Sequence, residues 1–137
     1  MSNKKCNNTN HSSIPWVEKY RPTSFESIVL DKTNKTLLEN MIEHHFMPNL
    51  LLYGPPGTGK TTTIINTIKL YQETKKEFGK ELVIHLNASD ERGIDTIRNQ
   101  IYQFVQGKTL FGKGTKFVIL DEVDYMTQNA QIALKQL

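Results

Sequence analysis

The most informative segment of this chain is Gly54-Pro55-Pro56-Gly57-Thr58-Gly59-Lys60-Thr61, which fits the pattern G-x-x-x-x-G-K-[S/T] at every fixed position. The glycines in such a loop let the backbone turn so that several N–H groups point inward at phosphate oxygens. Lys60 is expected to reach the β- and γ-phosphates of ATP, and the Thr61 hydroxyl to ligate Mg²⁺. A plain surface turn is the alternative, but the apolar segment before the loop and the helical pattern after it favour the phosphate-binding loop.

The residues on either side of this loop predict a strand and a helix. Residues 49–53 are a short, continuous apolar run, which is typical of a strand buried on both faces of a parallel sheet. Residues 62–76 follow helical spacing, and the side chains expected to point inward are Ile64, Ile65, Ile68 and Tyr71.

The same alternation continues through the rest of the chain. Helices are predicted over residues 33–44 and 95–105, strands over 81–86 and 116–120, and a glycine-rich loop over 107–115. In the first of these helices the apolar face consists of Leu37, Leu38, Met41 and Ile42. A further helical pattern runs to residue 137. The alternation predicts an α/β domain with a mostly parallel sheet flanked by helices, in which ligands bind beyond the carboxyl ends of the strands.

Length and composition restrict the class of protein. The 137 residues suffice for one domain, and 37% apolar with 23% charged residues is ordinary for a globular chain. Cys6 is the single cysteine, so no internal disulfide can form, and a reducing intracellular compartment is expected. No segment approaches the length of a membrane span. Residues 1–13 are polar and are expected to be a disordered tail, with the ordered domain covering residues 14–137.

An acidic pair, Asp121-Glu122, follows the last predicted strand. The strand places both acids at the edge of the sheet from which the phosphate loop also emerges. Asp121 is then positioned to hold Mg²⁺ through water, and Glu122 to orient or deprotonate the attacking water. The alternative is that both acids cap the next turn, but the pairing with a phosphate loop favours catalysis.

Three further features have weaker interpretations. Residues 15–22 are framed by two prolines, so an extended connector is expected, and its Trp16 and Tyr20 need a covering surface. Arg98 near the start of a helix is, on spacing alone, a solvated side chain. The four histidines show no metal-ligand spacing, and His85 is most simply part of one face of a strand.

Several segments together resemble the small subunits of the replication factor C clamp loader, a branch of the AAA+ ATPases. The segments are W-V-E-K-Y-R-P at residues 16–22, the loop at 54–62, N-A-S-D-E-R-G-I at 87–94 and V-I-L-D-E-V-D at 118–124. The loop marks a large superfamily, whereas the first and third segments are far more specific. The family often has alanine at the position of Val123, a change that leaves the acids untouched. The resemblance implies a P-loop NTPase fold of AAA+ type.

The resemblance also implies roles for individual residues. Val17 and Arg21 would line the adenine pocket, and the connector would fold over the base. Asn87 would hold the catalytic Glu122 in an inactive pose until DNA binds, and Arg98 would contact duplex DNA phosphates. The catalytic set is then Glu122, Lys60 and Asp121, with Mg²⁺ held by Thr61 and Asp121. The nucleotide contacts are Val17, Arg21, Gly54, Pro55, Pro56, Gly57, Thr58, Gly59, Lys60, Thr61 and Thr62.

Family members are more than twice as long as this chain. Their sensor residue, arginine finger, helical lid and collar domain would all follow Leu137, as would the strand that lies between the two strands bearing the site. We therefore expect an amino-terminal piece of the ATPase domain, incomplete at its C-terminus, whose unpaired sheet edge lacks a neighbour.

The resulting hypothesis is an ATP-binding and ATP-hydrolysing subunit of a DNA sliding-clamp loader in DNA replication. Its partners would be other clamp-loader subunits, the sliding clamp and primer–template DNA, in the nucleus or another site of replication. One alternative is a fragment that binds nucleotide without hydrolysing it. Another is a different AAA+ machine, such as a branch-migration helicase or a protein-remodelling ATPase. ATP hydrolysis by the chain alone is expected to be slow, because a neighbouring subunit supplies an arginine worth roughly 10³–10⁵ in rate.

Overall fold

The computed structural model describes residues 15–77, 80–89, 94–107, 114–128 and 131–132. Its helices are α1 (Trp16–Lys19), α2 (Lys32–Glu43), α3 (Lys60–Lys75) and α4 (Ile94–Gln106), with short 3₁₀ turns η1 (Lys80–Leu82) and η2 (Val123–Tyr125). Its strands are β1 (Val83–Asn87) and β2 (Phe117–Asp121). Helices and strands alternate from α3 to β2, as the sequence predicts, whereas α1, α2 and α3 follow one another without an intervening strand in the described residues 15–77. The expected tail at residues 1–13 and most of the expected last helix lie outside the described residues.

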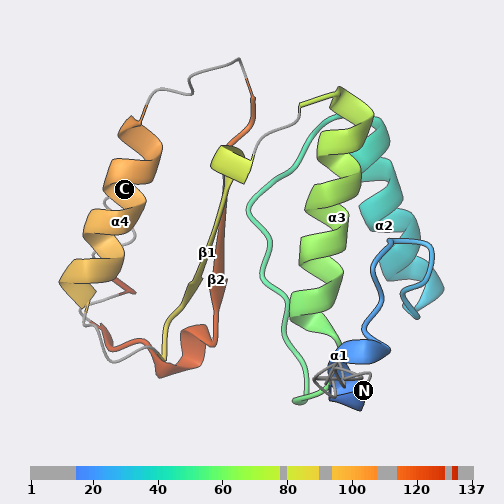
Figure 1. Ribbon diagram of the computed structural model, residues 1–137, viewed down its shortest axis with the longest axis horizontal. Coiled ribbons are helices and arrows are strands. Elements are labelled where there is room, and N and C mark those ends of the chain that lie inside the picture. Colours follow the sequence, from blue (N-terminus) through green and yellow to red (C-terminus); the bar gives the residue numbers. More distant parts are fainter. Residues whose placement is uncertain (1–14, 78–79, 90–93, 108–113, 129–130, 133–137) are drawn as a thin grey trace, which may run out of the picture.

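The two strands form a parallel pair between two layers of helices. The register runs from Val83 opposite Phe117 to Asn87 opposite Asp121. Figure 1 shows α4 on one side of the pair and α2 with α3 on the other. The predicted parallel arrangement is therefore confirmed, and both strands end at the same edge of the sheet.

Tyr71 fixes α3 against the sheet. Its ring is fully buried and meets the ring of Phe117 edge to face, with centroids 5.3 Å apart. Its hydroxyl donates a hydrogen bond to the carbonyl of His45 at 3.1 Å, so the one polar atom of the ring is satisfied. The surrounding core cluster contains Ile42, Ile68, Tyr71, Phe117 and Ile119. This packing sets where the N-terminus of α3 lies relative to the end of β2.

Helix α2 begins at a capping aspartate. A carboxylate oxygen of Asp31 accepts hydrogen bonds from the backbone N–H groups of Thr33 at 3.0 Å and Asn34 at 3.4 Å. These two donors would otherwise have no partner within the helix.

We expect the substitution Asp31→Ala to lower the free energy of unfolding by about 1 kcal/mol, the usual effect of losing an N-cap. Urea denaturation followed by circular dichroism measures this. Asp31→Asn is the matched control, because asparagine caps helices as well as aspartate does. Equal stability of the alanine and asparagine variants would contradict the capping role.

The predicted strand at residues 49–53 is wrong in this structure. The segment has no strand assignment, and Leu51 and Tyr53 are 77% and 89% exposed instead of buried on both faces. Figure 1 shows its trace passing between the sheet and α3. Within the described residues the sheet consists of β1 and β2 alone, so the segment has no neighbouring strand with which to exchange backbone hydrogen bonds.

The connector is helical where an extended chain was predicted. Pro15 immediately precedes α1, and its carbonyl accepts the N–H groups of Glu18 and Lys19, both at 2.9 Å. Pro15 itself is extended, with ψ of 141°, and the helix that follows it covers only Trp16–Lys19. Trp16 and Tyr20 meet edge to face at 6.4 Å but remain 80% and 70% exposed, so the expected cover is not present among the described residues.

The apolar faces of the helices are narrower than predicted. Leu37 and Ile65, both expected to point inward, are exposed. The buried side of α3 instead includes the polar residues Thr63, Asn66 and Thr67. Thr67 donates its hydroxyl hydrogen to the carbonyl of Thr63 at 2.8 Å, which removes the penalty for burying that group.

Candidate active site

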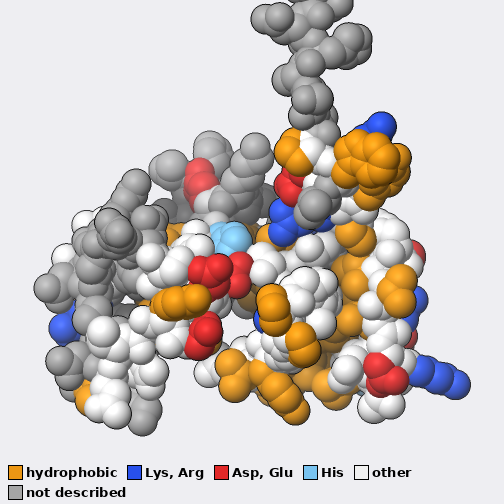
Figure 2. Space-filling model, turned by 90° about the horizontal axis from the view of Figure 1, so that it is seen from below, with side chains coloured by type: hydrophobic (Ala, Val, Ile, Leu, Met, Phe, Trp, Pro, Cys, Tyr) orange, Lys and Arg blue, Asp and Glu red, His pale blue; other side chains and the backbone are white. Residues whose placement is uncertain are grey.

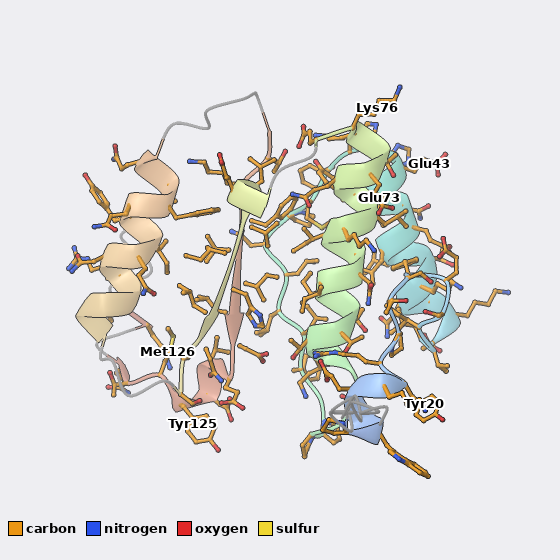
Figure 3. The ribbon with its side chains drawn as sticks, viewed as in Figure 1. Tyr20, Glu43, Glu73, Lys76, Tyr125 and Met126 are labelled. Carbon is orange, nitrogen blue, oxygen red and sulfur yellow. The ribbon has the colours of Figure 1, made fainter. Side chains whose placement is uncertain are left out.

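The carboxyl ends of β1 and β2, the N-terminus of α3 and helix α1 meet at one end of the molecule, the lower end in Figure 1. Figure 3 labels Tyr20 and Tyr125 at this end, one beside α1 and one beside η2. Figure 2 views the molecule from this end and shows acidic and histidine side chains lying together near its middle. The predicted meeting of strand ends and phosphate loop is therefore what the structure has.

The loop at residues 54–61 turns through left-handed backbone conformations. Gly57 has φ of 77° and Gly59 has φ of 80°, values that residues with a side chain rarely adopt. Gly59 caps α3, and its carbonyl accepts the N–H of Thr63 at 2.8 Å. The N–H groups of the first turn, from Lys60 onward, lack partners within the helix and form a ready site for phosphate oxygens.

The ammonium group of Lys60 lies over this loop. It donates hydrogen bonds to the carbonyls of Gly54 at 3.0 Å and Pro55 at 2.9 Å. The Thr58 hydroxyl donates to the same Pro55 carbonyl at 2.9 Å. These contacts hold the loop in its turned form and place a positive charge beside the free N–H groups of α3.

Thr61 and Asp121 are in direct contact, although 60 residues separate them in the sequence. The Thr61 hydroxyl donates a hydrogen bond to Oδ2 of Asp121 at 2.8 Å. A hydroxyl and a carboxylate oxygen are hard donors of the kind that Mg²⁺ prefers. The two residues predicted to hold Mg²⁺ therefore present a fitting donor pair.

The carboxyl group of Asp121 is held in its charged form. Burial acts to raise its pKa, but hydrogen bonds from Thr61, from the N–H of Glu122 and from His85 outweigh burial and lower the pKa below its ordinary value. A lowered pKa in the folded state means that the charged group stabilises the fold. This contribution is fully present above the unfolded pKa of about 3.9 and is lost as the pH falls through the folded pKa.

We therefore expect the stability of Asp121→Asn to depend less on pH, in the acidic range, than the stability of the wild-type chain. Urea midpoints measured from about pH 5 downward should fall more steeply for the wild-type chain than for the variant. Thr61→Val, which removes the donor of the shortest bond to this carboxylate, should give an intermediate slope. If the urea midpoint fell equally steeply with pH in all three proteins, the lowered pKa of Asp121 would be contradicted.

Glu122 has a strained backbone. Its φ is 55°, in the left-handed region, which costs a residue with a side chain of order 1–3 kcal/mol. Its N–H donates to Oδ1 of Asp121 at 3.1 Å, and its carbonyl accepts the N–H of Tyr125 at 3.0 Å. The turn leaves the Glu122 side chain exposed at the same edge as the loop. Strain of this kind gathers at functional positions.

The connector is fastened to the first turns of α3. Nε of Arg21 donates to the hydroxyl of Thr62 at 3.1 Å, and another guanidinium nitrogen lies 3.1 Å from a carboxylate oxygen of Glu18. Asn66, which is buried, donates to the carbonyl of Pro22 at 3.1 Å. Arg21 and Thr62, both predicted nucleotide contacts, therefore lie side by side. The side chain of Val17 lies outside the described residues.

Two predicted site residues, Asn87 and Arg98, make no hydrogen bond to the phosphate loop or the acidic pair within the described residues. Oδ1 of Asn87 accepts hydrogen bonds from the N–H and the hydroxyl of Ser89, both at 2.9 Å, and within the described residues no hydrogen bond joins it to Glu122. Arg98 is exposed on α4, across the sheet from α3. Residues 90–93 of the specific N-A-S-D-E-R-G-I segment lie outside the described part.

His85 belongs to the site and was missed from sequence. Its Nε2 lies 3.4 Å from Oδ2 of Asp121, the oxygen that also accepts from Thr61. His85 and Asn87 are two residues apart on β1 and therefore lie on the same face of the sheet. Because the register places Asn87 opposite Asp121, His85 shares that face with the carboxylate. The proximity of His85 to Asp121 follows from the parallel pairing of the two strands. A search for metal-ligand spacing along the sequence could not reveal it.

Comparison with known proteins agrees with this geometry. The profile of the ATPase family associated with various cellular activities (AAA) matches residues 50–136. The chain is 50% identical over 126 residues to "Replication factor C subunit 5" of Homo sapiens and 44% identical over 125 residues to "Replication factor C subunit 3" of Saccharomyces cerevisiae. Each match covers 91% of this chain but only 36% of the relative, so the chain spans little more than a third of their length.

The predicted resemblance to replication factor C subunits and the AAA+ type of fold are thereby confirmed. Among the described residues, no helix is long and apolar enough to cross a membrane.

Proposed function

Because the chain belongs to the AAA family of ATPases, whose profile matches more than half of it, we propose that it is the nucleotide-binding part of a DNA sliding-clamp loader acting in replication. The observation that carries this proposal is the 2.8 Å contact between Thr61 of the phosphate loop and Asp121 of the acidic pair. This contact supports a working ATPase site, and the similarity to replication factor C subunits supports the clamp-loader assignment.

Each residue of the site has a chemical task in this proposal. Lys60 and the N–H groups of the first turn of α3 bind the phosphates of ATP. Thr61 and Asp121 would hold Mg²⁺, which when bound neutralises charge on the phosphates. Glu122 takes a proton from the water that attacks the γ-phosphorus, and ADP and inorganic phosphate leave. Val17 and Arg21 line the base pocket.

The remaining roles concern regulation and partners. Asn87 is proposed to restrain Glu122 until DNA binds, with its side-chain NH₂ group donating to the Glu122 carboxylate while its Oδ1 accepts from Ser89. Arg98 is exposed and free to contact a DNA phosphate, which would position the duplex without reading its sequence. The proposed partners are other clamp-loader subunits, a ring-shaped sliding clamp and primer–template DNA, in the nucleus or another place of replication.

The test is ATP turnover by the chain together with its partner subunits, with and without a sliding clamp and primed DNA. Stimulation by clamp and DNA together is the expected result. Turnover that neither component changes would favour a different AAA+ machine, such as a branch-migration helicase. Binding of ATP with no turnover under any condition would favour a nucleotide-binding role alone.

A further inference from the structure

The connector that contains α1 is attached to α3 at two points. Nε of Arg21 donates to the hydroxyl of Thr62 at 3.1 Å, and Nδ2 of Asn66 donates to the carbonyl of Pro22 at 3.1 Å. Thr62 and Asn66 are four residues apart, so they lie on one face of α3, about one turn from each other. Two successive residues of the connector are therefore held against the first turns of the helix that follows the phosphate loop, where Figure 1 shows α1.

Asn66 is the buried part of this attachment, with only 5% of its surface exposed. Its side-chain NH₂ group also donates to the carbonyl of Thr62 at 2.9 Å, so a single amide joins the backbone of α3 to the connector. The neighbouring buried residue Thr67 differs, because its hydroxyl bonds to a carbonyl of its own helix. An apolar side chain could fill such a position without needing any hydrogen-bond partner. A buried amide whose bond leaves the helix therefore indicates a role in holding the connector.

We infer that Asn66 is a positioning residue for recognition of the nucleoside part of ATP, because it holds the connector, and with it Arg21, beside the bound nucleotide. This inference rests on the proposed function, in which Val17 and Arg21 line the base pocket. If the connector is free to leave α3, the affinity for ATP falls in proportion to the fraction of molecules in which the connector is in place. Inorganic tripolyphosphate has no base, so its binding to the phosphate loop should not depend on the connector.

The test is titration calorimetry of ATP and, separately, of inorganic tripolyphosphate, each with Mg²⁺, on the wild-type chain and its variants. Asn66→Ala and Asn66→Ser should each weaken ATP binding by about 3- to 10-fold, the range for loss of one ordinary hydrogen bond, and leave tripolyphosphate binding unchanged. Serine is informative because its hydroxyl can still bond to the carbonyl one turn earlier, as Thr67 does, but is too short to reach Pro22. Asn40→Ala, at an exposed asparagine of α2, is the matched control and should bind both ligands as the wild type does.

Hydrogen exchange gives a second measurement that does not depend on any ligand. The backbone amides of residues 16–21 should exchange faster in both Asn66 variants than in the wild type, because the connector has lost its buried attachment. Circular dichroism confirms that each variant is folded.

The two ligands separate a role in base recognition from support of the phosphate loop. Wild-type ATP affinity in both Asn66 variants, or equal weakening of ATP and tripolyphosphate, would overturn the inference. A wild-type chain that binds tripolyphosphate as tightly as ATP would also overturn it, although the phosphate site would stand. A wild-type chain that binds neither ligand would overturn the proposed function itself, and the role of Asn66 with it.

Discussion

Replacement of Lys60 by alanine is expected to weaken binding of ATP with Mg²⁺ by roughly 10- to 100-fold. A charge-assisted hydrogen bond is worth about 1.5–3 kcal/mol, and each 1.4 kcal/mol changes affinity tenfold. Lys60 is the cation that lies over the loop, where it already donates to the carbonyls of Gly54 and Pro55. Titration calorimetry on the purified chain measures the affinity directly.

The control for this experiment is Lys69→Ala. Lys69 is an exposed lysine on the same helix, two and a half turns further on, so it carries the same charge away from the loop. Its loss should leave ATP affinity unchanged. If both variants bind as the wild type does, the loop does not hold the phosphates, and the proposed nucleotide site is wrong.

Glu122→Gln is expected to slow ATP cleavage by roughly 10²–10⁴-fold while leaving ATP affinity nearly unchanged, because a general base acts on the reaction and not on binding. Glutamine has nearly the same shape but cannot accept a proton from water. The backbone bonds of residue 122, to Asp121 and from Tyr125, do not involve the replaced atoms. Single-turnover cleavage of labelled ATP, with protein in excess and partner subunits present, measures the step.

Asp124→Asn provides the comparison. Asp124 is an exposed acid two residues further along, in η2. Removing its charge tests whether the loss of any nearby carboxylate slows ATP cleavage. Cleavage should remain close to that of the wild type. Equal slowing by both variants would show that the effect is electrostatic and not specific to Glu122.

The parts of the fold that could be predicted from sequence are those controlled by local patterns. Helices α2, α3 and α4 and both paired strands lie within a few residues of their predicted bounds, because apolar periodicity and turn residues act over short distances. The contact between Thr61 and Asp121 could be predicted because the phosphate loop opens α3 and the acidic pair ends β2, and both motifs belong at the carboxyl edge of a parallel sheet.

The errors arise where a residue's surroundings matter more than its own pattern. Residues 49–53 have every local property of a buried strand, but a strand needs a neighbour, and the described sheet gives it none. Ile65 fits the apolar spacing of α3, yet threonines and an asparagine of the same helix are buried in its stead. His85 became visible as a site residue only through the pairing of β1 with β2.

The exposed segment at residues 49–53 also bears on how the chain behaves at high concentration. It is uncharged, it lacks proline and it consists largely of leucine. Leu51 and Tyr53 face solvent beside a sheet whose outer edges have no partner strand within the described part of the chain. Such a segment is the common seed of self-association, because an extended apolar strand from one molecule can add to the open edge of another. These five residues are therefore the expected starting point of any self-association of this polypeptide, whose net charge of +3 offers only modest repulsion.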